Sequence, residues 1–201
     1  MPESSHAAAG HPVAHQFDTA EQQYEASQLG MWLFLVNEVM FFGGALAAFL
    51  VSFVLYAPAF EDASNHLSLP LGALNTVVLL TSSPTMALAV HAAQTGERQG
   101  QVRFLFWTLL LGLVFLVVKA YEYSHKFHEG LVPGPWFDYA GPQAAEHELF
   151  LSFYFALTGL HALHMVIGIG ILAALIVMAR RGRFDAGYFT PVELSGLYWH
   201  F

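Results

Sequence analysis

Four long apolar runs constrain what this chain can fold into. They cover about 29–56, 70–94, 102–123 and 148–179. A run of ~18 or more apolar residues predicts a membrane-spanning helix, because ~20 residues at a rise of ~1.5 Å each cover the ~30 Å hydrocarbon core of a bilayer. Only 11% of the 201 residues are charged, whereas soluble domains carry roughly 25%. The sequence therefore predicts an all-α, polytopic transmembrane helical bundle.

A fifth apolar segment begins near Glu193 and reads "ELSGLYWHF" up to the last residue, Phe201. Nine residues cannot cross a bilayer, which takes ~20 in a helix. We expect this segment to be a last helix that the sequence has only begun, and therefore a truncated one. Together with the four runs it would give a bundle of five helices.

The segment that precedes the first run, residues 1–28, contains His6, His11 and His15 but no Lys or Arg. A secretory signal needs a basic start, so we do not expect this segment to be one. We interpret 1–28 as a flexible cytoplasmic tail and 29–201 as the transmembrane domain. A metal-binding tail is the alternative that its histidines leave open.

Basic residues in the loops predict how the helices are oriented, because cytoplasmic loops carry an excess of Lys and Arg. The tail shares its side of the membrane with the loops after the second and fourth runs. Five arginines fall on that side and two lysines on the other: Arg98, Arg103, Arg180, Arg181 and Arg183 against Lys119 and Lys126. This bias predicts a cytoplasmic N-terminus and an outer loop at 124–147.

The chain contains no cysteine and has a net charge of -8. The first fact excludes disulfides, iron–sulfur clusters and cysteine zinc sites. The second argues against a nucleic-acid partner, which would require a basic face. No phosphate-binding glycine loop and no nucleophilic triad appears either, so we expect no catalytic residues in this chain.

Glu38 lies inside the first apolar run, about nine residues or roughly 14 Å from its start. A charge at such a depth costs at least ~2.5–3.5 kcal/mol on insertion scales. We therefore expect Glu38 to be buried at helix contacts and protonated at neutral pH, with a neighbouring polar group as its partner. Asn37, His161 and His164 are the candidate partners. A role in carrying protons and a structural role both remain open.

Glu122 ends the third run and follows Lys119 by three residues, which places both on one helix face. We expect the two charges to neutralise one another near the membrane interface. His161 and His164 are likewise separated by three residues and share a face of the fourth run. They could bind a metal or haem, but a di-iron bundle needs carboxylates as well. A buried polar network that joins helices is the interpretation we favour.

Several of these segments, in the same order, resemble the cytochrome c oxidase subunit III family. "LGMWLFLVNEVMFFGG" is similar to the family's helix around a buried glutamate, with Asn37 where the family usually has serine. "LNTVVLLTSSPTMALA", "KAYEYSH", "LSFYFALTGLHALHMVIG" and "LYWHF" resemble later helices. The resemblance covers about 29–201 and corresponds to the short, five-helix bacterial form.

The resemblance implies a subunit without redox chemistry. Family members bind neither haem nor copper; those cofactors are expected in the partner subunits. The family members pack on catalytic subunit I of a haem–copper oxidase, hold structural phospholipid, and support proton uptake. The expected location is the inner (plasma) membrane of a bacterium. Glu38 corresponds to the family's carbodiimide-reactive carboxyl. Glu122, His161 and His164 become buried polar or proton-related candidates. Interface candidates are Asn37, Trp199 and His200, and lipid-headgroup candidates are Arg180, Arg181 and Arg183.

Other functions remain possible from the sequence. The chain could serve a quinol oxidase or a nitric oxide reductase system, because the electron donor binds other subunits. A membrane cytochrome with His161 and His164 as haem ligands is a less favoured alternative. A proton-coupled transporter built around Glu38 is disfavoured, because five spans without inverted repeats are unlike such proteins.

The orientation gives the first testable prediction. A cysteine introduced at Ala144 should react with a membrane-impermeant reagent on intact cells, whereas one at Ser4 should not. The reason is the five-to-two bias of basic residues between the two sides. Labelling that is stronger at residue 4 than at residue 144 would show the reverse orientation.

Overall fold

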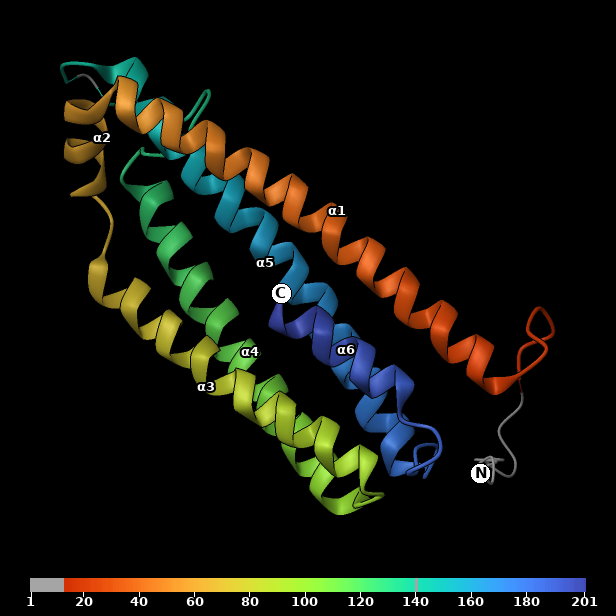
Figure 1. Cartoon of the computed structure of the whole chain (residues 1–201). Coiled ribbons are helices and arrows are strands. Elements are labelled where there is room, and N and C mark those ends of the chain that lie inside the picture. The colour runs from red at the N-terminus through yellow and green to blue at the C-terminus, as the bar shows by residue number, and fades with distance from the viewer. Residues whose placement is uncertain (1–12, 140) are drawn as a thin grey trace. The chain divides into compact units, whose positions relative to one another are not determined.

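The computed structural model describes residues 13–139 and 141–201, and within them the chain is all-α (Figure 1). Four helices are long and apolar enough to cross a membrane: α1 (Ala20–Leu55), α3 (Leu69–Gln94), α4 (Arg98–His128) and α5 (Ala144–Arg180). Two shorter helices are α2 (Ala57–Ser64) and α6 (Thr190–His200). The predicted transmembrane helical bundle is confirmed, and each of the four predicted spans lies on one of the long helices.

Local chemistry explains where the long helices begin and end. The Thr19 hydroxyl accepts a hydrogen bond of 3.1 Å from the Gln22 N–H, so Thr19 caps the start of α1. Just after the C-terminal end of α5, Gly182 has a φ of +70° and its N–H donates a hydrogen bond to the Ala179 carbonyl. The next N–H, that of Arg183, bonds to the Met178 carbonyl. A left-handed glycine with these two bonds is a common helix stop.

Several boundaries differ from those expected from hydropathy. The loop expected at 124–147 is shorter, because α4 continues to His128 and α5 begins at Ala144. α1 begins at Ala20 rather than near residue 29, because its first turns are rich in Glu and Gln, which are polar but good helix formers. The acidic segment between the first two apolar runs, which hydropathy leaves unassigned, contains the short helix α2. Pro58 stands in the first turn of α2, where a proline is tolerated, and α2 buries Phe60 completely.

The contacts divide the chain into two compact units. Unit 1 takes the described part of Met1–Leu35 together with Ser83–Leu109 and Ile171–Phe201, and unit 2 takes Val36–Ser82 and Leu110–Gly170. Each of the four long helices contributes residues to both units. Each unit has a hydrophobic core of its own.

The core of unit 1 brings together α3, α4, α5 and α6. Met86, Leu105, Leu172 and Val192, one from each helix, are buried there. α6 can approach α3 closely because position 196 is a glycine. A Cβ at Gly196 would lie only 3.0 Å from the Val90 Cγ2 atom.

The core of unit 2 is aromatic and fixes the short helix α2. The Phe60 ring lies 5.8 Å from that of Phe49 on α1 and 5.2 Å from that of Phe150 on α5, between centroids. In Figure 1, α2 accordingly lies beside the end of α1 and the start of α5. Edge-on and tilted ring pairs of this kind add to the stability gained from burying apolar area.

Candidate functional site: two polar clusters

The first polar cluster, which we call the lysine cluster, consists of Lys119 and Glu122 on α4 and Tyr154 on α5, all in unit 2. The Lys119 Nζ atom lies 2.9 Å from the Glu122 Oε2 atom and 3.2 Å from the Tyr154 hydroxyl. The Tyr154 hydroxyl donates a 2.6 Å hydrogen bond to the other Glu122 oxygen, Oε1. The expected pairing of Lys119 with Glu122 is thus confirmed, and Tyr154 is a third member.

Glu122 is 5% exposed, so its carboxylate depends on these two partners for its solvation. A charge removed from water costs several kcal/mol unless it is paired and hydrogen-bonded. The Lys119 ammonium also lies 5.1 Å from the centre of the Tyr154 ring, within reach of a cation–π attraction. In the lysine cluster, the opposite charges of Lys119 and Glu122 cancel on α4, and the bonds of both groups to Tyr154 connect α4 to α5.

A neighbouring contact continues the same helix pair one turn further along. The Tyr123 hydroxyl lies 2.5 Å from the Thr158 hydroxyl, and Thr158 in turn donates to the Tyr154 carbonyl. Tyr154 and Thr158 are four residues apart and therefore share a face of α5. α4 and α5 are thus joined in this region by polar contacts as well as by packing.

The second cluster, the glutamate–histidine pair, joins α1 to α5 in unit 2. The Glu38 Oε2 atom lies 3.2 Å from the His164 Nε2 atom, and the two side chains are 13% and 21% exposed. The distance is that of an ion pair, although the alignment is not that of a good hydrogen bond. Of the three candidate partners, His164 is the one that the structure places next to Glu38. Glu38 thus lies at a contact between α1 and α5 and is partly covered there; its full burial stays a prediction.

Hydrogen-bond roles limit the protonation of this pair. The His164 Nδ1 atom lies 3.0 Å from the Leu160 carbonyl oxygen. A carbonyl oxygen can only accept, so Nδ1 carries a hydrogen. The Nε2 atom that faces Glu38 is then either an acceptor, which requires a protonated carboxyl, or a donor on a charged imidazole. An attractive contact in either case requires one proton between the two atoms, and the pair has no net charge.

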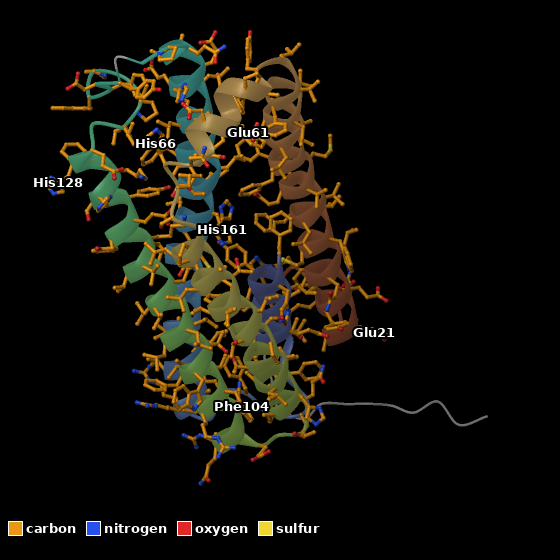
Figure 2. The ribbon with its side chains drawn as sticks, turned by 90° about the vertical axis from the view of Figure 1, so that its left-hand side faces the viewer. Glu21, Glu61, His66, Phe104, His128 and His161 are labelled. Atoms are coloured by element: carbon orange, nitrogen blue, oxygen red, sulfur yellow. The ribbon has the colours of Figure 1, made fainter. Side chains whose placement is uncertain are left out.

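His161 does not join its neighbour His164. Its ring packs edge-on against the Phe115 ring, 5.4 Å away between centroids. Figure 2 shows His161 well along the helices of unit 2, away from the end that carries Glu61, His66 and His128. Among the described residues, no three His, Cys, Asp or Glu side chains are grouped so that they could hold a metal ion.

His161 lines a cavity of about 380 Å³ within unit 2, which receives side chains from α1, α3, α4 and α5. Asn75 lines the same cavity and is 3% exposed. Within the described chain neither polar atom of the Asn75 amide has a hydrogen-bond partner. Lys119 also lines this cavity, so the cavity has a polar side next to the lysine cluster.

The other predicted site residues lie outside these clusters. The Asn37 side chain is on the surface of the chain. Trp199 packs against the core of unit 1, and the His200 Nε2 atom lies 3.1 Å from the Ser83 carbonyl oxygen, also in unit 1. Arg180, Arg181 and Arg183 are exposed at the end of α5 and just after it.

A further buried base, Lys126, was not singled out as a site residue from the sequence. It is 4% exposed and donates hydrogen bonds to the His66 carbonyl and to Glu129. This hydrogen bond from Lys126 holds the pKa of Glu129 below its usual range. Lys126 and Glu129 are three residues apart, a spacing that could have revealed the pair. Tyr154 and Asn75 were also not singled out from the sequence, where the one indication of a role was a polar group within an apolar run.

The fold and these clusters define a class: a polytopic helical membrane protein with acids and bases paired between or along its spans. Comparison with known proteins gives the family. Residues 14–201 match the family described as Cytochrome c oxidase subunit III. The chain therefore belongs to the haem–copper oxidase subunit III family, as the sequence motifs indicated.

Individual relatives come from different oxidases. The chain is 29% identical over 86% of its length to cytochrome c oxidase subunit 3 of Corynebacterium diphtheriae, covering 80% of that protein. It is 30% identical over 98% of its length to cytochrome bo(3) ubiquinol oxidase subunit 3 of Pseudomonas aeruginosa, covering 88% of it. Cytochrome c oxidase subunit 3 of Dasypus novemcinctus is 31% identical over 86% of the chain, which spans 62% of that relative.

The lysine cluster gives the second prediction. Lys119→Met should destabilise the protein by about 3–5 kcal/mol, because it leaves the buried Glu122 carboxylate with Tyr154 as its one partner of the cluster. The double variant Lys119→Met/Glu122→Leu should regain most of this loss, since no buried charge remains. Thermal unfolding in detergent, followed by circular dichroism, measures both.

Val117→Met is the matched control, because Val117 lies on the same helix and is 68% exposed. It should change the unfolding temperature little. A double variant less stable than Lys119→Met alone would contradict the assignment of the cluster as a charge-neutralising unit.

Proposed function

We propose that this chain is a non-redox accessory subunit of a haem–copper terminal oxidase in aerobic respiration. The observation that carries the proposal is the family match over residues 14–201. In this role the chain stabilises the catalytic subunit, binds phospholipid and supports proton uptake, and haem and copper belong to partner subunits. The two polar clusters fit such a role, since each of them joins two helices.

The surface of α1 supports association within the membrane. No residue of this 36-residue helix is buried in the chain, and large apolar side chains such as Met40 and Val54 are 73% and 77% exposed. A helix of this composition must be covered by lipid or by other apolar helices. We propose that part of this surface contacts catalytic subunit I or another oxidase subunit.

We propose cytochrome c as the electron donor of the complex, since the relatives in Corynebacterium and in Dasypus carry the name cytochrome c oxidase. A quinol oxidase is the second candidate. It is favoured by the relative in Pseudomonas, a ubiquinol oxidase subunit that matches 98% of this chain.

Purification of the native complex in a gentle detergent tests these proposals. The chain should co-purify with a haem–copper catalytic subunit, and the complex should consume oxygen faster with reduced cytochrome c than with ubiquinol. The reduced-minus-oxidised spectrum of the isolated chain should show no haem. Recovery of the chain without an oxidase core, or with haem of its own, would contradict the accessory role, and faster turnover with quinol would select the second donor.

The glutamate–histidine pair yields the third prediction. We propose that Glu38 is structural. Glu38→Gln should assemble and retain most of the oxygen reduction, because a glutamine amide can donate to the His164 Nε2 atom just as a protonated carboxyl does. Glu38→Ala removes that partner and should weaken attachment of the chain to the catalytic subunit. Subunit retention during purification and oxygen uptake are the measurements.

Glu61→Gln is the control, since Glu61 is an exposed acid on α2. It should leave both measurements unchanged. An assembled Glu38→Gln complex that loses most of its turnover would contradict the structural role and support proton transfer through this carboxyl.

A further inference from the structure

His147, in the first turn of α5, is buried with an oxygen atom next to each of its ring nitrogens. Its side chain is 3% exposed. The Nδ1 atom lies 3.0 Å from the carbonyl oxygen of Gln143, four residues earlier in the chain. The Nε2 atom lies 3.0 Å from the Oδ2 atom of Asp62 on α2. All three residues belong to unit 2, so the imidazole connects α5 to α2 through its polar atoms.

The two contacts of the imidazole are satisfied together when the ring carries a hydrogen on both nitrogens. A carbonyl oxygen accepts hydrogen bonds and cannot donate them. The Asp62 side chain is 60% exposed, and an aspartate in contact with water is a carboxylate at neutral pH, which also only accepts. A neutral imidazole has one donor and one acceptor, so it would turn a lone pair toward one of the two oxygens. The geometry therefore fits the positively charged form of His147.

The surroundings of His147 favour the charge in some respects and oppose it in others. The Tyr139 ring is stacked on the imidazole, with centroids 4.5 Å apart and planes at 21°, and the face of an aromatic ring attracts a cation. Glu146 and Glu148 are acidic neighbours on the same helix. Burial and the positive end of the helix dipole disfavour a cation at this place. The charge on His147 therefore depends on its specific contacts, and chiefly on Asp62.

Other titratable groups lie on the elements next to His147, but none of them bonds to it within the described residues. The His66 ring packs edge-on against the far partner of the stack, Tyr139, at 6.1 Å between centroids. The remaining groups of this kind are Glu61, Lys126, Glu129 and Asp138. Lys126 and Glu129 are paired with one another. Asp62 is therefore the one charged side chain that bonds directly to the imidazole.

The helix that Asp62 belongs to needs such an attachment. α2 has eight residues and no side-chain cap at its N-terminus, and helices shorter than ~12 residues are marginal in water by themselves. Burial of Phe60 in the aromatic core holds one face of α2. Among the described residues, the bond from His147 to Asp62 is the one side-chain hydrogen bond that joins α2 to another helix. Figure 1 shows α2 beside the start of α5, where this bond lies.

We propose that the contact between His147 and Asp62 is a pH-sensitive latch that fixes α2 to the start of α5. While His147 carries its second proton, both oxygens accept hydrogen bonds and α2 is held. When that proton passes to water by way of the exposed Asp62 carboxylate, one oxygen faces a lone pair and the latch opens. The stabilisation is thus present at low pH and is lost as the pH rises through the range of about 5–8, in which histidines usually change charge.

Hydrogen exchange of the α2 backbone amides, followed by mass spectrometry on the full chain in detergent, tests the latch. The measured quantity is the protection factor, which is the intrinsic exchange rate at a given pH divided by the observed rate, so that the pH dependence of the exchange chemistry cancels. Protection of α2 in the unmodified protein should fall about fivefold from about pH 5.5 to about pH 8.5. An ion pair that is partly open to water contributes a factor of roughly this size.

Two substitutions of Asp62 separate the bond from its pH dependence. Asp62→Ala removes the acceptor, so α2 should be about fivefold less protected at pH 5.5 than in the unmodified protein, with little further change at pH 8.5. Asp62→Asn should make protection independent of pH, because an amide can accept from the charged ring and donate to the neutral one. Both substitutions are at an exposed position, so both variants should fold.

Glu61→Ala is the matched control, since Glu61 is the adjacent exposed acid on α2. It should keep the pH dependence of the unmodified protein. Protection of α2 that does not change with pH in the unmodified protein would overturn the proposal. So would a fall in protection that persists in Asp62→Ala, or an equal loss of pH dependence in Glu61→Ala. The latch does not rest on the accessory role, which co-purification and oxygen consumption test separately.

Discussion

The need to neutralise charge within hydrocarbon governs the spanning part of this protein. The side chains of Lys119 and Glu122 are only 14% and 6% exposed, so water cannot solvate them well. Their ion pair replaces most of the lost hydration, and the Tyr154 hydroxyl bonds to both groups. The contacts that satisfy them reach from α4 to α5. The ion pair itself lies within α4, and the Tyr154 hydroxyl, which bonds to both charged groups, adds α5 to this contact in unit 2. Leaving either charge unpaired would cost several kcal/mol.

The two kinds of basic residue follow different rules as a result. The two lysines are bound to carboxylates and serve the fold. The five arginines form no ion pair within the described residues, and all of them lie in unit 1. A guanidinium binds a phosphate bidentately and is less strongly hydrated than an ammonium. The paired lysines thus serve the fold, whereas no carboxylate of the described residues neutralises the arginines, although Arg98 still bonds to the Ala179 carbonyl.

Hydropathy was sufficient to predict the four spans, since a long apolar run has few alternatives to a membrane helix. Helix spacing was sufficient for the contact between Lys119 and Glu122, which is local. Contacts between helices were not predictable in the same way. The sequence left Asn37, His161 and His164 as equal candidates for Glu38, and packing of α1 on α5 selected His164. Arg98, Arg103 and Arg180 line one groove, although Arg180 is far along the chain from the other two, so spacing alone indicated only the cluster at 180–183. α2 was missed because eight residues with two acids carry no strong hydropathy signal.

Glu38 and Glu122 represent two solutions to one problem. Glu122 is matched by the Lys119 ammonium ion and the Tyr154 hydroxyl. Glu38 faces an imidazole whose other nitrogen is already committed to the Leu160 carbonyl, so one proton between the two side chains leaves no net charge. The second solution needs neither a lysine nor a water-accessible position. It also allows the proton to lie on either atom without changing the charge of the pair. A carboxyl can therefore be kept in an apolar span for the helix contact that it makes, and its presence there is not by itself a sign of proton transport.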